Sequence, residues 1–246
     1  MRAGLLLLTL LTLFACDART KQAAPPRLIL WAWERPEDLR FVQAPAEVAY
    51  QAGFVVIEGD GIEARGRHFP LQVAAPPSTV LVHVQISHAR PLVWSPELRA
   101  RVSAAVLHFA RASPARRVQI DFEVRQSERQ ALLDVLADIR RGLPAGTTLS
   151  MTALASWCAD EDWLDQAPVD EIVPMLFRMQ KGGDSIRKLL AEGGDFRNPK
   201  CRTALAISTD SPIARAPPGR RIYLFNPRSW DASAFHQAQR AVEAWR

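Results

Sequence analysis

Residues 118–123 read VQIDFE, and this strictly alternating stretch decides the fold prediction. Side chains of a β-strand point alternately to its two faces, so this strand has one apolar and one polar face. The apolar face is formed by Val118, Ile120 and Phe122, and the polar face by Gln119, Asp121 and Glu123. An apolar face packs against helices, whereas carboxylates are tolerated near the open end of a barrel. The pattern therefore predicts a barrel strand whose carboxylates point inward, near its mouth.

Other short apolar or alternating runs flank this strand, with turn residues between them. The predicted strands are Leu28–Trp33, Phe54–Glu58, Val80–Ser87, Val118–Val124, Thr148–Leu154, Ile172–Phe177, Thr203–Ser208 and Ile222–Asn226.

Several connections between these strands have helical patterns. Ser95 and Pro96 are a capping hydroxyl and a first-turn proline, and apolar residues then recur at helical spacing. Ser127 is the expected cap of a second helix, and residues 231–245 carry one apolar stripe. Helices alternating with strands predict a parallel sheet, and eight such units predict closure.

The predicted fold is thus α/β, a single compact and somewhat irregular (β/α)₈ TIM barrel over residues 27–246. It is irregular because residues 58–61 (EGDG) predict a hairpin and the proline-rich segment 209–220 leaves room for little more than a turn. A doubly wound open sheet is the alternative fold.

Charge indicates no nucleic-acid partner. The chain has 246 residues and a net charge of +5, and its arginines are scattered rather than gathered into a basic stripe. We expect a monomer with a solvated basic surface.

The N-terminus indicates export. Arg2 precedes an apolar run that is too short to cross a bilayer but typical of a signal peptide, which we place at residues 1–15. Residues 13–16 (LFAC) resemble the bacterial lipobox, which implies lipidation of Cys16, with residues 16–26 as lipidated cysteine and tether. The expected location is the periplasmic side of the cell membrane, and ordinary secretion is the alternative.

Two further cysteines, Cys158 and Cys201, would be exposed to an oxidising compartment. The predicted strand layout places them near opposite ends of the barrel, so we expect them not to pair.

Polar residues gather on the inward faces of three neighbouring strands. They are His83, Gln85 and Ser87 on one strand, Gln119, Asp121 and Glu123 on the next, and Ser150 and Thr152 on the third. Neighbouring carboxylates in a partly dry site raise one another's pKa, which suits general acid chemistry. Glu123, nearer the mouth, is the candidate acid, and Asp121 would orient it and balance positive charge. A buried hydrogen-bond network without turnover is the alternative.

The stretch 118–123 resembles the end of the strand-four signature of glycoside hydrolase family 18, the chitinase-like barrels, and residues 175–177 (MLF) resemble that family's strand-six motif. The resemblance implies that Glu123 is the acid and Asp121 the aspartate before it. Gln119 and Arg116 stand where earlier aspartates are usual, and Phe177 and Arg178 where a tyrosine and an acidic or amide residue are usual. That tyrosine helps to hold an acetamido group, so N-acetylated sugars are not implied.

The mature chain as a whole resembles a bacterial family of unknown function whose members are expected to be TIM-barrel proteins of the cell envelope. The segments that carry this resemblance are residues 148–158, 174–179 and 206–210.

Aromatic residues near predicted strand ends could stack on sugar rings: Trp33, Trp94, Trp157 and Trp230. Arg178 and Asp210, at the ends of two later strands, are further substrate-binding candidates, or else form an ion pair that closes the rim. With His83, Gln85, Gln119, Thr152 and Phe177 they complete the expected binding set.

No metal-ligand spacing, phosphate loop, dinucleotide fingerprint or nucleophile elbow occurs, so we expect neither metal nor cofactor. The predicted function is that of a glycoside hydrolase-like envelope lipoprotein acting on a glycan or oligosaccharide. The alternative is a catalytically inactive barrel that binds saccharide or protein.

Overall fold

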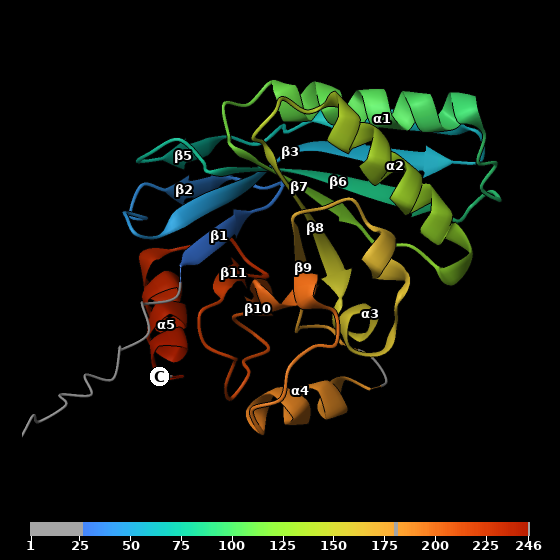
Figure 1. The fold of residues 1–246 in the computed structure, drawn as a ribbon. Coiled ribbons are helices and arrows are strands. Elements are labelled where there is room, and N and C mark those ends of the chain that lie inside the picture. The colour runs from blue at the N-terminus through green and yellow to red at the C-terminus, as the bar shows by residue number, and fades with distance from the viewer. Residues whose placement is uncertain (1–26, 180–181, 246) are drawn as a thin grey trace, which may run out of the picture.

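The alternating stretch forms strand β7 (Arg117–Phe122), which pairs in parallel with β6 (Thr79–Ser87) on one side and β8 (Thr148–Leu154) on the other. The computed structural model describes residues 27–179 and 182–245, and within them eight parallel strands form one closed sheet (Figure 1). The remaining strands are β1 (Leu28–Ala32), β3 (Glu47–Glu58), β9 (Glu171–Met175), β10 (Ala204–Ser208) and β11 (Arg221–Phe225).

Pairing of β1 with both β11 and β3 closes the barrel, so the TIM-barrel prediction is confirmed and the open sheet is excluded. Strand β3 begins at Glu47, seven residues before the predicted start, and its first half pairs with β1.

The helices are α1 (Pro96–Arg111), α2 (Arg129–Gly142), α3 (Ala155–Asp160), α4 (Gly183–Ala191) and α5 (Ala232–Glu243), with 3₁₀ turns η1 (Gln126–Glu128), η2 (Trp163–Gln166) and η3 (Pro199–Arg202). As expected, the Ser95 hydroxyl caps α1 by accepting from the Leu98 N–H at 3.2 Å. The expected Ser127 cap is wrong. Ser127 lies inside η1, a turn that is held instead by the Glu128 carboxylate accepting from the Arg125 N–H at 2.8 Å.

The barrel is irregular where the sequence predicts it. Strand β4 (Gly61–Gly66) returns antiparallel to β3 as the expected hairpin, and the segment between β10 and β11 forms no helix. An unpredicted two-stranded sheet joins β2 (Glu37–Leu39) to β5 (Leu71–Val73).

Apolar residues form two separate layers. The larger layer lies between the sheet and the helices and includes Val118, Ile120 and Phe122, as alternation predicts. The smaller layer fills the barrel interior and is centred on Trp31 and Tyr223. Polar side chains of β6, β7 and β8 that point into the barrel are removed from water, so they must form hydrogen bonds with one another.

Cys158 and Cys201 are joined by a disulfide, with Cα atoms 6.0 Å apart, so the expectation that they stay apart is wrong. Cys158 lies in α3, which turns back over the outside of the barrel after β8, and Cys201 lies in η3, just before β10. The Asn198 N–H donates to the Cys158 carbonyl, which shows that the two segments lie side by side.

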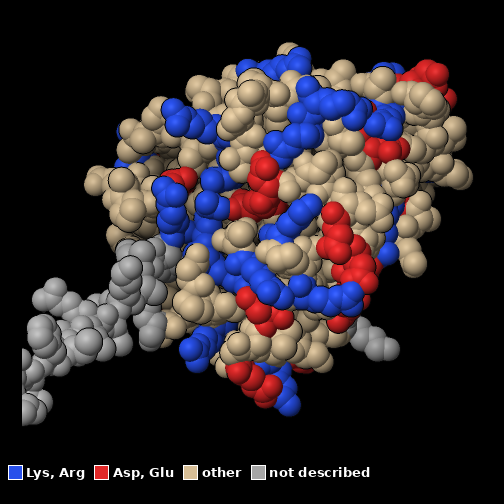
Figure 2. Space-filling view, in the orientation of Figure 1, with Lys and Arg blue, Asp and Glu red and all other residues tan. Residues whose placement is uncertain are grey.

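Cationic and anionic side chains are interspersed on the face drawn in Figure 2, where blue areas are repeatedly interrupted by red ones. Within the described ranges no helix is long and apolar enough to span a bilayer. The expected signal peptide, lipobox and tether lie outside the described residues.

Candidate functional site

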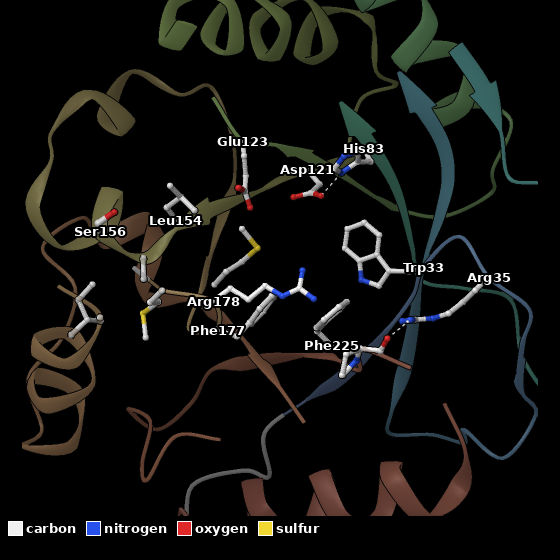
Figure 3. A pocket seen from close by; sticks show the side chains of 16 residues that line it. Trp33, Arg35, His83, Asp121, Glu123, Leu154, Ser156, Phe177, Arg178 and Phe225 are labelled. Carbon is white, nitrogen blue, oxygen red and sulfur yellow. Dashed lines mark hydrogen bonds and ion pairs between the residues drawn. The ribbon is translucent and has the colours of Figure 1, made fainter. Parts of the chain in front are cut away.

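The carboxyl ends of the barrel strands surround a pocket of about 830 Å³. Glu123, Asp121 and His83 lie along one side, Phe177, Arg178 and Phe225 along the facing side, and Trp33 between the two groups (Figure 3). The lining also includes residues of the β8–α3 junction, of β9, of α4 and of the segments that follow β1 and β11. This volume lies within the range of pockets that bind small ligands.

Asp121 has partners at both carboxylate oxygens. His83 Nδ1–H donates to its Oδ2 at 2.6 Å, and Thr152 Oγ1–H donates to its Oδ1 at 2.6 Å. The contact with His83 follows from register, because His83 and Asp121 are direct neighbours across β6 and β7. These two hydrogen bonds fix the orientation of the Asp121 carboxylate between β6 and β8.

Glu123 follows the end of β7 and shares the inward face with Asp121, about 6 to 7 Å nearer the mouth. Its carboxylate accepts no hydrogen bond from any residue in the described ranges. Glu123 is exposed at the mouth, but the desolvation by the surrounding pocket walls, and then the negative charge of Asp121, raise the pKa of Glu123 against the opposing charges of His83 and Arg178. An unpartnered carboxyl with a raised pKa that faces open space is suited to donate a proton.

His83 lies between the carboxylates and the aromatic side of the pocket. Its ring stacks on Phe54 with centroids 4.7 Å apart and meets the Trp33 ring edge-on at 5.9 Å. Burial opposes protonation, but the hydrogen bond to Asp121 and the charges of Asp121 and Glu123 prevail and raise the pKa of His83. The imidazolium form of His83 is thereby stabilised beside Asp121.

Aromatic rings form the side of the pocket that faces the carboxylates. Phe177 and Phe225 stack with centroids 5.2 Å apart, and Trp33 meets Phe225 edge-on at 6.0 Å. The buried Nε1–H of Trp33 has no hydrogen-bond partner within residues 27–179 and 182–245. An unpaired buried donor costs free energy and is common where a ligand or water completes the site.

The other expected rim tryptophans lie elsewhere, which corrects that expectation. Trp157 is buried in α3 against Trp163, and Trp230 is buried with its Nε1–H donated to the Trp31 carbonyl at 3.0 Å. Trp94 donates to Asp134 Oδ2 of α2 at 3.0 Å. All three rings belong to the apolar layer between the sheet and the helices rather than to the pocket.

Three further candidates do not line the pocket. Gln119 is fully buried one layer below Asp121, where it accepts from Trp31 Nε1–H at 2.7 Å and donates to Ser150 at 3.2 Å. Gln85 is exposed near the end of β6. Asp210 is exposed after β10, accepts a hydrogen bond from Ser208, and forms no ion pair with Arg178.

Thr152 contributes indirectly, through its hydrogen bond to Asp121. Asp121 therefore lies between His83 and Thr152, whereas Gln119 and Ser150 pair with each other in the layer below.

Arg35 and Phe225 also line the pocket and were not among the predicted site residues. Arg35 follows β1 and donates to Glu37 and to the carbonyls of Asn226 and Pro227. Phe225 is the inward-facing last residue of β11, and alternation from Tyr223 could have identified it.

Within the described part of the chain, no group of three or more His, Cys, Asp or Glu residues is placed to hold a metal ion.

No protein-family model matches the sequence, and the search of curated proteins found no match. Among solved structures, the chain is similar to the crystal structure of the chitinase domain of the spore coat protein CotE from Clostridium difficile. The TM-score is 0.44 and the sequence identity 13%, over 86% of this chain and 67% of that chain. The TIM-barrel assignment rests on the closed strand order of this chain itself.

Proposed function

We propose that this chain is an exported, lipid-anchored barrel that hydrolyses a glycosidic bond of a glycan, with Glu123 as general acid and Asp121 as its supporting carboxylate. The observation that carries the proposal is the contrast between two carboxylates on one inward face. Asp121 is partnered at both oxygens, whereas Glu123 is unpartnered, has a raised pKa and lines the pocket.

In the proposed reaction, protonated Glu123 gives its proton to the glycosidic oxygen as the bond between that oxygen and the anomeric carbon breaks. The fixed charge of Asp121 balances the positive charge that develops on the sugar ring. Water then adds to the anomeric carbon and returns a proton to the Glu123 carboxylate, which restores the acid.

The aromatic side of the pocket supports a sugar as the ligand. Trp33, Phe177 and Phe225 present apolar rings opposite the carboxylates, and the unpaired Trp33 Nε1–H is a donor without a protein partner. Sugar rings have apolar faces that stack on aromatic rings and hydroxyl groups that accept hydrogen bonds.

Two features support the proposed location. The Cys158–Cys201 disulfide suits an oxidising compartment. The apolar run that ends at Cys16 suits export and lipidation at the periplasmic side of the membrane.

One observation favours the alternative, a catalytically silent glycan-binding barrel. Asp121 and Glu123 are the two carboxylates that line the pocket in the described ranges, and both oxygens of Asp121 already accept hydrogen bonds, from His83 and Thr152. A second carboxylate free to act as nucleophile or base is thus lacking, and water or the substrate itself must supply the nucleophile.

The test is turnover of a panel of labelled glycans by the wild type, Glu123→Gln and Glu58→Gln. Glu58 is a matched control because it ends strand β3, two strands away from β7 in the barrel, but lies outside the pocket lining, held by Ser87 and Arg90. We expect Glu123→Gln to lose roughly 10²- to 10⁴-fold in activity and Glu58→Gln to retain it. Binding of glycans without turnover by any variant would favour the silent barrel.

A further inference from the structure

Arg178 is a cation of the pocket without an anionic partner. It follows the end of β9, two residues after Leu176, whose N–H donates to the Ala206 carbonyl of β10. Its side chain extends toward the middle of the pocket (Figure 3). It forms neither a hydrogen bond nor an ion pair with any residue in the described ranges. Its guanidinium carbon lies 5.3 Å from the centroid of the Phe225 ring, so the ring supports the side chain while leaving its N–H donors free.

Arg35, the other arginine in the lining, differs in this respect. Its guanidinium donates to Glu37 and to two backbone carbonyls, at 2.5 to 2.8 Å. These contacts occupy its donors and neutralise its charge. Arg35 thus holds the β1 and β11 ends together, and Arg178 remains available for a ligand.

The backbone at Arg178 is also unusual. Its φ is 52°, in the left-handed region that residues other than glycine seldom adopt, and it is the sole such residue in the described ranges. Such strain is concentrated at ligand sites, where the surrounding structure must hold it. Here it turns the chain after Phe177 so that the arginine enters the pocket beside the aromatic rings.

The pocket has a net positive charge in the state in which Glu123 can donate a proton. When Glu123 carries its proton and His83 is protonated beside Asp121, the first is neutral and the second pair cancels. Arg178 is exposed at the mouth of the pocket, and its charge is then uncompensated. A negatively charged ligand group would balance it.

We propose that the pocket binds an acidic glycan, and that Arg178 receives the carboxylate of a uronic acid-type sugar. This inference deepens the proposed function and rests on it. The planar guanidinium fork matches a carboxylate in two parallel hydrogen bonds, which a neutral sugar cannot offer.

The test measures binding by calorimetry in full-length protein carrying Glu123→Gln, so that cleavage cannot consume the probe. The probes are hexasaccharides of polygalacturonate, alginate and hyaluronan, each as the free acid and as the methyl ester. Cellohexaose supplies a neutral glycan, and a carrageenan hexasaccharide supplies sulfate without carboxylate. Arg178→Met and Arg178→Lys are compared with Arg240→Met, which removes an exposed cation of α5 away from the pocket.

At least one free acid is expected to bind roughly 10- to 100-fold more tightly than its methyl ester, with an affinity that falls as salt rises. Arg178→Met should abolish that difference, Arg178→Lys should keep part of it, and Arg240→Met should leave it intact. Equal binding of acid and ester, tightest binding of carrageenan, or an unaffected Arg178→Met variant would each overturn the inference.

Failure of the inference can be told from failure of the proposed function. If the wild type cleaves glycans without preferring acidic ones, the proposed hydrolase activity stands and the proposed acidic-glycan specificity is rejected. If acidic glycans bind in an Arg178-dependent way but the wild type cleaves none of them, the acidic-glycan specificity stands and the proposed hydrolase activity is rejected. Binding of no probe, acidic or neutral, overturns both.

Discussion

Reduction of the Cys158–Cys201 disulfide is expected to lower the free energy of unfolding by about 4 kcal/mol. The bond links residues separated by 43 positions in the chain. The loop-closure entropy that it removes from the unfolded chain is about 13 cal/mol/K, or about 4 kcal/mol at 25 °C, with about 2 kcal/mol as the low end of measured effects. Both cysteines are fully buried, so comparing oxidised and reduced wild type isolates the cross-link from the packing of the sulfur atoms.

Urea unfolding with and without reductant measures this effect, in protein carrying Cys16→Ser so that no third thiol intervenes. The slope of unfolding free energy against urea should rise on reduction, because the unlinked unfolded chain exposes more surface. A Cys158→Ala, Cys201→Ala variant should resemble the reduced protein and be insensitive to reductant. Identical midpoints and slopes for oxidised and reduced wild type would refute the reasoning.

Three further perturbations have defined outcomes. Because Glu123 acts in its protonated form, kcat/KM should fall as pH rises through its pKa, which desolvation in the pocket and the charge of Asp121 raise. Arg178→Met should move that fall to higher pH by removing a cation that lowers the pKa, and a pH profile unchanged by the substitution would contradict this. Cys16→Ser should release the protein from the membrane fraction or leave the precursor uncleaved, and unchanged membrane association would disprove lipidation. Gly53→Ala would place a Cβ atom 2.2 Å from the Phe109 ring and should cost about 1 to 3 kcal/mol of stability in urea unfolding, whereas a neutral effect would mean that α1 can retreat.

The barrel could be predicted from sequence because its strands are buried apolar runs with clear turn signals between them. The first half of β3 was missed since residues 47–53 (EVAYQAG) mix polar, small and aromatic side chains. This segment is a strand because barrel closure supplies β1 as its partner. Strands β2 and β5 are three residues each, too short for any periodicity to appear.

The carboxylate side of the site followed from alternation and strand order alone. Parallel register places His83 beside Asp121, and Thr152 lies at the equivalent level of β8. The aromatic side of the pocket could be predicted only in part from alternation and strand order. The directions of Trp157 and Trp230 depend on how loops fold after the strands end, and the sequence has no periodic signal for that.

The disulfide was missed for a related reason. Strand order places Cys158 after the carboxyl end of β8 and Cys201 before the amino end of β10, which indicates opposite ends of the barrel. Helix α3 begins directly after β8 and carries Cys158 back along the outside, where η3 lies beside it. The helical pattern of residues 155–160 is too short to reveal this reversal.

The most direct test of Glu123 as the proton donor compares substrates with one sugar and two leaving groups. The first is an unactivated alcohol, which needs protonation to depart, and the second is 2,4-dinitrophenolate, which does not. Glu123→Gln is expected to slow cleavage of the first by roughly 10²- to 10⁴-fold and of the second far less, whereas Asp121→Asn should slow both alike through loss of its fixed charge. Full activity of Glu123→Gln on the unactivated glycoside would contradict the assignment of Glu123 as general acid.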